Sequence, residues 1–479
     1  MEPGKGDVSL YIYVVQPGDT LWQISQRTGV SISELVTANG IVNPNLLAAG
    51  QALVIPVPDV IHTVQPGDTL WRIAQRYDVT INEIINANNI QNANVLFVGQ
   101  RLIIPAPYTT HTIRPGETLW QIARLYKTTI QDIIRVNNIQ NPSLIYAGQQ
   151  ILVRKPVIET NGYLTSFGTA GQNVARNTSP YLTYFSIFSY GIAKGGGLSN
   201  PDDTAVRQIA RSNGAAPLMV ITNFEGRTFS PELARDVLSS REAQETLVSN
   251  ILQRLESKNF AGLNIDFEYV PPDQRENYNA FLQRVADAIR PRGFLLSSAL
   301  APKETAGQIG LLYEAHDYPA HGRINDFVVL MTYEWGYAAG PPWAIAPENK
   351  VRDILDYAIT AIPREKILMG VPTYGRDWRL PYQPGTVART ISPVEAVSIA
   401  AQRGSVIQFH PVYLSPYFYY TDDTGVNHEV WFEDARSLQY KFNLVNEYGL
   451  KGISYWELSS PFPQNWLVLQ HNFQIRKII

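Results

Sequence analysis

The feature that most constrains this chain is a segment of about a dozen residues that occurs three times near the N-terminus. The copies read VVQPGDTLWQIS from Val14, TVQPGDTLWRIA from Thr63 and TIRPGETLWQIA from Thr112. Two sets of glycines keep a constant spacing of 49 residues: Gly18, Gly67, Gly116 and Gly50, Gly99, Gly148. Because the spacing never changes, the first third of the chain consists of three copies of one small module. Repeated modules suit a polymeric ligand, since each copy adds avidity.

The composition describes a globular protein and excludes several classes of partner. The chain has 479 residues, 45% of them hydrophobic and 17% charged, which is enough for two to four domains. The net charge of −3 comes without a long Lys/Arg run, so neither nucleic acid nor an anionic membrane is an expected partner. Cysteine is absent, which excludes disulfides and cysteine-ligated zinc.

The N-terminal residues, MEPGKGDVSLYIYVVQPGD, lack a basic segment followed by an apolar one. We therefore expect no classical signal peptide, and no stretch reaches the roughly 18 apolar residues of a membrane span. The protein is expected either in the cytosol or delivered by a route other than ordinary secretion.

Each repeat predicts a βααβ module of about 45 residues, with boundaries at 11–56, 60–105 and 109–154. Thr20 and the aligned Thr69 and Thr118 are expected helix N-caps, and the segment from Ser31 to Glu34 predicts a capping box for the second helix. An Asn-rich loop and a Gly-Gln pair precede the second strand. Proline joints at 56–58 and 105–107 predict stiff spacers, so we expect the modules to lie as separate beads.

The PGDTLW segment, the Asn-rich loop and the closing GQ-L-IP pattern resemble the LysM module. The resemblance implies binding to N-acetylglucosamine glycans such as peptidoglycan or chitin, in a groove between the first loop and the Asn-rich loop. The implied groove residues are Gly18, Asp19, Thr20, Gly67, Asp68, Thr69, Gly116, Glu117 and Thr118. Asp19 and Thr20 have an alternative role as helix caps, and Trp22, Trp71 and Trp120 are expected to be core residues.

From about residue 157 to 479 the pattern changes to apolar strands alternating with amphipathic helices. Eight strands are predicted: Gly162–Phe167, Leu182–Ser189, Pro217–Asn223, Gly262–Phe267, Leu295–Leu300, Phe327–Tyr333, Ile367–Tyr374 and Gly452–Glu457. Near-continuous apolar strands separated by helices favour an α/β fold, a (β/α)8 TIM barrel, with a doubly wound open sheet as the alternative. A small α+β insertion is expected between strands 7 and 8, at about 376–440.

The fourth predicted strand, GLNIDFE, carries the residues that suggest chemistry. Asn264, Asp266 and Glu268 alternate and so share one face, at the carboxyl end where TIM barrels place their active sites. Acids on an otherwise apolar strand are costly unless they have a role, although an exposed strand end would be a simpler explanation. Two acids with aromatics at other strand ends suggest glycoside hydrolysis. No G-x-S-x-G motif is present, and the seven histidines show no metal-ligand spacing.

Residues 157–479 resemble glycoside hydrolase family 18, whose DxxDxDxE motif aligns with Ala261 to Glu268. The resemblance implies a retaining, substrate-assisted mechanism in which the sugar's acetamide is the nucleophile and an oxazolinium ion forms. Glu268 would be the general acid/base, while Asp266 and Tyr333 would hold the acetamide. The implied substrate-binding residues are Asn264, Met331, Glu334, Tyr374 and Trp456.

Two motif positions depart from the family, because Ala261 and Asn264 stand where it has Asp. Glu334 also stands where the family usually has Asp. We expect the Asn264 amide to donate a hydrogen bond to Asp266, so that activity needs only Asp266 and Glu268. No metal or other cofactor is expected.

LysM copies joined to a family 18 barrel resemble the cortex-lytic N-acetylglucosaminidases of spore-forming bacteria. The resemblance implies cleavage after N-acetylglucosamine in spore cortex peptidoglycan or its fragments, at the spore coat, cortex or cell wall. Two alternatives stay open: a chitinase, and a catalytically inactive glycan-binding coat or wall protein. The sequence leaves the oligomeric state open.

Overall fold

The computed structural model describes residues 11–56, 61–77, 79, 81–88, 90, 92–93, 95–104, 108–226 and 228–479. The chain divides into two compact units. One reaches to Val157 and includes Pro463–Gln474, and the other comprises Ile158–Phe462 with Ile475–Ile479. The proline joints lie mostly outside the described residues. Within the described ranges, no helix has the length and apolarity needed to cross a bilayer.

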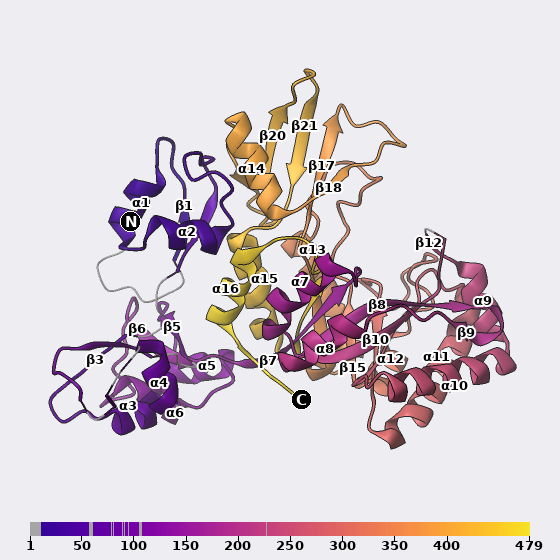
Figure 1. Cartoon of the computed structure of the whole chain (residues 1–479), viewed down its shortest axis with the longest axis horizontal. Coiled ribbons are helices and arrows are strands. Elements are labelled where there is room, and N and C mark those ends of the chain that lie inside the picture. The colour runs from indigo at the N-terminus through magenta and orange to yellow at the C-terminus, as the bar shows by residue number, and fades with distance from the viewer. Residues whose placement is uncertain are drawn as a thin grey trace. The chain divides into compact units, whose positions relative to one another are not determined.

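The N-terminal unit contains three βααβ modules, drawn in indigo to violet in Figure 1. The first consists of β1 (Tyr11–Val14), α1 (Leu21–Thr28), α2 (Ile32–Asn39) and β2 (Ala52–Ile55). The second consists of β3 (Ile61–Thr63), α3 (Leu70–Tyr77), α4 (Ile81–Asn88) and β4 (Arg101–Ile103). The third consists of β5 (Tyr108–Thr112), α5 (Leu119–Leu125), α6 (Ile130–Asn137) and β6 (Gln150–Arg154). In each module the two strands pair antiparallel, as the repeat predicted.

Helix caps and a repeated asparagine explain why so short a sequence folds. Thr20 and Thr118 form capping boxes with Gln23 and Gln121, and Ser31 forms one with Glu34, which confirms the predicted N-caps. The last residue of α2, Asn39, donates from Nδ2 to Leu35 O (2.9 Å) and to Val54 O (2.8 Å), and accepts from Val54 N (2.6 Å). Asn88 and Asn137 make the same three bonds in their own modules. This asparagine therefore joins the second helix to the second strand.

Two expectations for the modules are wrong. Trp22, Trp71 and Trp120 are not core residues: they are 62%, 62% and 58% exposed. Leu21 and Ile24 fill the core of the first module instead, because their spacing of three residues places both on the apolar face of the helix.

The modules are also not all separate beads. Tyr108 and Val136 of the third module lie in the buried cluster of the second. Arg135 of the third module donates to Gln75 O (3.0 Å) and Arg76 O (2.8 Å), at the end of α3. These contacts join modules two and three, because α6 satisfies carbonyls that α3 leaves unpaired at its end.

The second unit is a closed barrel of eight parallel strands. They are β7 (Val157–Leu164), β8 (Tyr184–Ala193), β10 (Ala216–Thr222), β13 (Gly262–Asp266), β14 (Leu295–Leu300), β15 (Phe327–Leu330), β16 (Ile367–Pro372) and β22 (Gly452–Trp456). Strand β7 pairs with both β22 and β8, which closes the sheet and rules out the open-sheet alternative.

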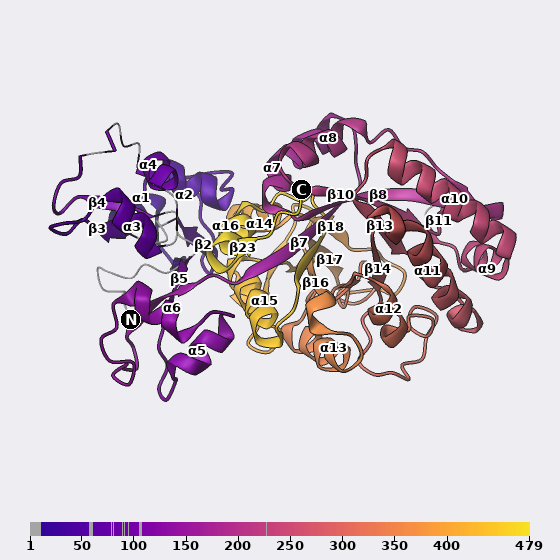
Figure 2. The same cartoon turned by 90° about the horizontal axis from the view of Figure 1, so that it is seen from below.

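The barrel helices follow the strands in sequence and lie outside them, as Figure 2 shows for α8, α10, α11 and α13. They are α7 (Thr169–Thr178), α8 (Thr204–Ser212), α9 (Pro231–Ser239), α10 (Arg241–Ser257), α11 (Arg275–Ile289), α12 (Tyr318–Ile324), α13 (Glu348–Ala361) and α15 (Ala435–Tyr448). The last helix of the chain is α16 (Pro463–Asn472).

The first strand begins earlier than the sequence predicted, because it opens with buried polar residues. Glu159, Thr160 and Asn161 are at most 5% exposed. Tyr184 donates to Glu159 Oε2 (2.6 Å), and Asn161 donates to Ser454 Oγ (3.0 Å). Polar side chains can be buried when they form hydrogen bonds with neighbouring strands. A strand that begins with such residues is not recognised from a run of apolar residues.

An antiparallel sheet with one helix lies between β16 and β22 in sequence. Its elements are β17 (Gly375–Leu380), β18 (Arg389–Ile391), α14 (Pro393–Arg403), β19 (Gln408–Phe409), β20 (Pro416–Thr421) and β21 (Asn427–Trp431), with strand order β18-β17-β21-β20-β19. Trp378 and Trp431 of this insertion share a buried cluster with Tyr374, against which Tyr333 and Trp456 pack. The insertion therefore supports one side of the barrel mouth.

Candidate active site

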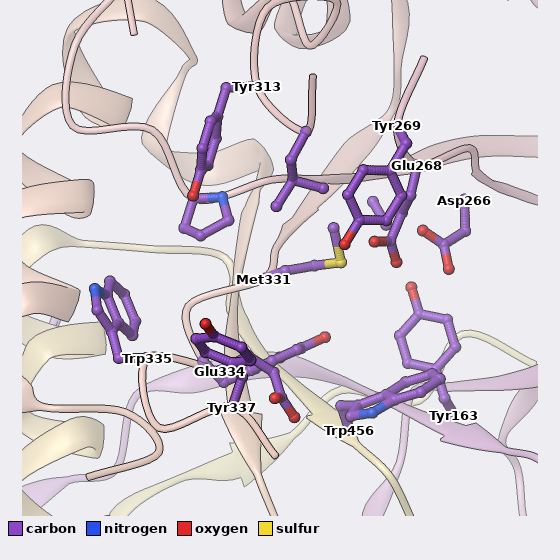
Figure 3. Close-up of a pocket in the computed structure, with 14 residues that line it drawn as sticks. Tyr163, Asp266, Glu268, Tyr269, Tyr313, Met331, Glu334, Trp335, Tyr337 and Trp456 are labelled. Carbon is purple, nitrogen blue, oxygen red and sulfur yellow. The ribbon is translucent and has the colours of Figure 1, made fainter. Parts of the chain in front are cut away.

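A cavity of about 450 Å³ lies at the carboxyl ends of the barrel strands (Figure 3). Its lining comprises Tyr163, Asp266, Glu268, Tyr269, Ala299, Pro302, Leu312, Tyr313, Met331, Tyr333, Glu334, Trp335, Tyr337 and Trp456. Six of the eight site residues predicted in the barrel line it, whereas Asn264 and Tyr374 do not. The size and the mixture of aromatic and carboxyl groups suit a sugar residue.

Asp266 and Glu268 are placed by strand β13. Asp266 is its last residue, and Glu268 points to the same side two residues later, with both carboxyl groups directed into the cavity in Figure 3. Burial raises the pKa of Asp266 to about 7. Burial, together with the charges of Asp266 and Glu334, raises the pKa of Glu268 well above its ordinary value. Glu268 thus keeps its proton near neutral pH, as a general acid must.

Asn264 does not donate to Asp266, contrary to the expectation from sequence. Its Nδ2 donates to Ser297 Oγ (2.9 Å), and its Oδ1 accepts from Tyr163 OH (3.1 Å). Within the part of the chain that the structure describes, Asp266 Oδ1 is buried without a hydrogen-bond partner. These partners of Asn264 lie on strands β14 and β7. The alternation of side chains along β13 does not predict which residues of other strands lie beside Asn264.

Aromatic side chains form much of the cavity wall. The ring of Trp456 lies 5.5 Å from Tyr163 and 4.9 Å from Phe188 between centroids, both in edge-on arrangements. Burial raises the pKa of the Tyr333 phenol well above its ordinary value, so this group remains a hydrogen-bond donor. A rigid indole face and a phenolic donor are groups that bind a sugar ring and its amide.

Glu334 forms a polar corner between the barrel and the insertion. Its Oε1 accepts from Arg376 Nη2 (2.8 Å) and also from the Tyr374 hydroxyl. Tyr374 is only 4% exposed, so it acts by holding Glu334 rather than by lining the cavity. Met331 lines the cavity, as predicted from its strand end.

Five aromatic lining residues were not predicted from the sequence: Tyr163, Tyr269, Tyr313, Trp335 and Tyr337. Tyr269 and Trp335 directly follow the acids Glu268 and Glu334, so adjacency to those acids was a usable signal. Tyr313 lies in a long loop after β14, where no periodicity could reveal its direction.

The predicted LysM groove residues have structural partners. Gly18, Gly67 and Gly116 adopt φ of 87°, 86° and 80°, which favours glycine at this turn. Asp19 pairs with Arg27, Asp68 with His62 (2.7 Å) and Glu117 with His111 (2.9 Å). The glycine at this turn and the acidic residue after it therefore each have a structural role that does not depend on a ligand.

In the described ranges, no group of three or more His, Cys, Asp or Glu side chains could hold a metal ion.

Known proteins share both halves of this architecture. The model of glycosyl hydrolases family 18 matches residues 159–460, and the LysM domain model matches residues 13–56, 62–105 and 111–154. The chain belongs to glycosyl hydrolase family 18. It also carries three LysM domains, so both resemblances drawn from the sequence are confirmed.

Individual relatives of this family 18 enzyme are similar over most of their length. The cortical fragment-lytic enzyme of Bacillus subtilis (strain 168) is 47% identical over 325 residues, which is 67% of this chain and 75% of that protein. The crystal structure of the spore cortex-lytic enzyme SleL from Bacillus megaterium QM B1551 superposes with a TM-score of 0.76 at 36% identity, covering 98% of this chain and 99% of that one. A chitinase structure from Chromobacterium violaceum ATCC 12472 has a TM-score of 0.62 at 25% identity over 66% of this chain and 98% of that one.

Proposed function

We propose that this family 18 enzyme is a retaining N-acetylglucosaminidase that cleaves after N-acetylglucosamine in spore cortex peptidoglycan or its fragments. The observation that carries the proposal is the Asp266–Glu268 pair, which shares one cavity with Tyr333 and Trp456. The similarity to proteins named cortical fragment-lytic and spore cortex-lytic enzymes supports the choice of polymer.

Glu268 acts as the general acid in this scheme. Its raised pKa keeps it protonated in the resting enzyme, so it can deliver the proton to the departing glycosidic oxygen. The same carboxylate then takes a proton from the water that attacks the intermediate.

The substrate's own acetamide supplies the nucleophile, so a second carboxylate nucleophile is not required. Attack by the acetamide oxygen gives an oxazolinium ion and, after hydrolysis, retained configuration at the anomeric carbon. Asp266 polarises and orients the acetamide, while Tyr333 donates a hydrogen bond to it. Trp456 forms the floor beneath the sugar at the cleaved bond.

The LysM domains retain the enzyme on its polymer. Three domains for one class of glycan raise the effective concentration of the barrel at the glycan chain. We place the contacts at the loops carrying Gly18, Asp19 and Thr20, with the aligned Gly67, Asp68, Thr69, Gly116, Glu117 and Thr118. We place the enzyme itself at the spore cortex or cell wall.

Product analysis tests the proposal. The purified enzyme is incubated with cortex peptidoglycan that another lytic enzyme has already cut, with chitohexaose in parallel, and products are identified by mass spectrometry. We expect muropeptides ending in reducing N-acetylglucosamine and little cleavage of chitohexaose. Rapid cleavage of chitohexaose alone would instead identify a chitinase. Binding without products from either would identify an inactive glycan-binding protein.

A further inference from the structure

Glu268 stands where the hydrogen bonds of the barrel sheet end. The last residue of β13 that pairs with β10 is Asp266, opposite Thr222, and the last that pairs with β14 is Ile265, opposite Ser298. Tyr269, the next residue after Glu268, has φ 53°, a conformation that bulky residues rarely adopt. The strand ladder therefore does not fix the peptide groups on either side of Glu268.

A buried asparagine holds the Glu268 backbone from the side of β10. Asn223 directly follows β10 and is fully buried. Its Oδ1 accepts from Glu268 N (3.0 Å), and its Nδ2 donates to Glu268 O (2.8 Å) and to Ser230 O (3.0 Å). One side-chain amide thus replaces the donor and the acceptor that another strand residue would provide.

A buried histidine holds the same segment from the side of β14. His316 is 1% exposed, its Nδ1 accepts from Ala301 N (2.7 Å), and its Nε2 lies 3.0 Å from Phe267 O. Because a backbone N–H occupies Nδ1, the ring proton is on Nε2 and is donated to Phe267 O. That carbonyl belongs to the peptide group that ends in Glu268 N. Burial also lowers the pKa of His316 to about 4, so the imidazole ring is uncharged near neutral pH.

We infer that Asn223 and His316 are positioning residues, which together fix both peptide groups beside Glu268 and so set the position of its carboxyl group. Neither residue lines the cavity, so neither is expected to touch the substrate. The inference rests on the proposed role of Glu268 as acid/base. A misplacement of about 1 Å in a reacting group can lower a rate by about 10²-fold, so the effect belongs in kcat rather than in substrate binding.

The test compares His316→Leu and His316→Gln with a second buried histidine as the matched control. His321 is fully buried on α12 and bonds to Ser298 Oγ (2.8 Å), with no hydrogen bond to the Phe267–Glu268 segment. We expect His316→Leu to lower kcat on pre-cut cortex fragments by about 10- to 100-fold, with KM within about threefold. His316→Gln should recover most of kcat, because its amide can donate to Phe267 O. His321→Leu should lower the melting temperature but leave kcat within about threefold.

Asn223→Ala tests the other half of the arrangement, and it carries the test if His316→Leu does not fold. It should also lower kcat at least tenfold with little change in KM. A kcat within threefold of the unmodified enzyme in the folded variants would overturn the inference. So would an equal loss of kcat in His321→Leu at a matched melting temperature.

Glu268→Gln, measured alongside, separates this inference from the proposed function. Turnover in Glu268→Gln would overturn the acid/base assignment itself. An inactive Glu268→Gln with fully active His316→Leu and Asn223→Ala would overturn only the positioning roles.

Discussion

At the scale of single residues, the burial of Asp266 links the stability of the barrel to pH. The unfolded chain releases this proton near the ordinary pKa of about 4, whereas the folded chain keeps it up to about pH 7. The folded state therefore binds more protons between these values, and stability falls as pH rises across them.

We predict that Asp266→Asn, which cannot ionise, stabilises the barrel more at pH 8 than at pH 5. The difference should be on the order of 2 to 3 kcal/mol. Calorimetric melting of both proteins at the two pH values measures it. Asp287→Asn, which changes an exposed carboxyl on α11, is the control and should show no such difference. An equal effect of Asp266→Asn at both pH values would show that Asp266 is ionised in the folded enzyme.

At the same scale, the sequence was informative where chemistry demands particular residue types. Asp266 and Glu268 were predicted from acids that alternate on an apolar strand, and Tyr333 and Trp456 from the resemblance to family 18. The partners of Asn264 could not be predicted, since Tyr163 and Ser297 become its neighbours only when the barrel closes.

At the scale of elements, the modules depend on the asparagine that ends the second helix of each. Removing the Asn137 side chain deletes its hydrogen bonds with Leu152 N, Leu152 O and Ile133 O, whereas Trp120 is 58% exposed. We predict that Asn137→Ala destabilises the third module by about 2 kcal/mol and that Trp120→Ala costs less than about 1 kcal/mol. Hydrogen exchange of the β6 amides in the full chain measures both. A larger loss in Trp120→Ala would show that the tryptophan is a core residue after all.

Helices and strands with a clear periodicity of apolar residues were predicted well, whereas the strand that begins with polar residues was not. The βααβ order and seven of the strands followed from caps and apolar runs. The first barrel strand was displaced because Glu159, Thr160 and Asn161 are buried with partners on other strands. The tryptophans were assigned to the core on residue type, although helical spacing already placed Leu21 and Ile24 on the opposite face of α1.

At the scale of the whole molecule, the LysM domains and the barrel with Asp266 and Glu268 belong to different compact units. We propose that the first retains the glycan and the second cleaves it. We predict that Glu268→Gln sediments with insoluble cortex peptidoglycan as the unmodified enzyme does, within about twofold in affinity, because the substitution lies outside the LysM domains. A loss of sedimentation would show that the barrel cavity, rather than the LysM domains, supplies most of the binding.

The most direct test of Glu268 as the general acid/base is the rate at which Glu268→Gln releases reducing ends from pre-cut cortex fragments. Glutamine keeps the size of the side chain and cannot exchange a proton, so we predict a loss of at least about 10³-fold with the fold intact. Glu334→Gln, measured in parallel, should retain far more activity, because Glu334 is tied to Arg376 and Tyr374 rather than placed as the acid. Turnover by Glu268→Gln at a rate near that of the unmodified enzyme would contradict the account.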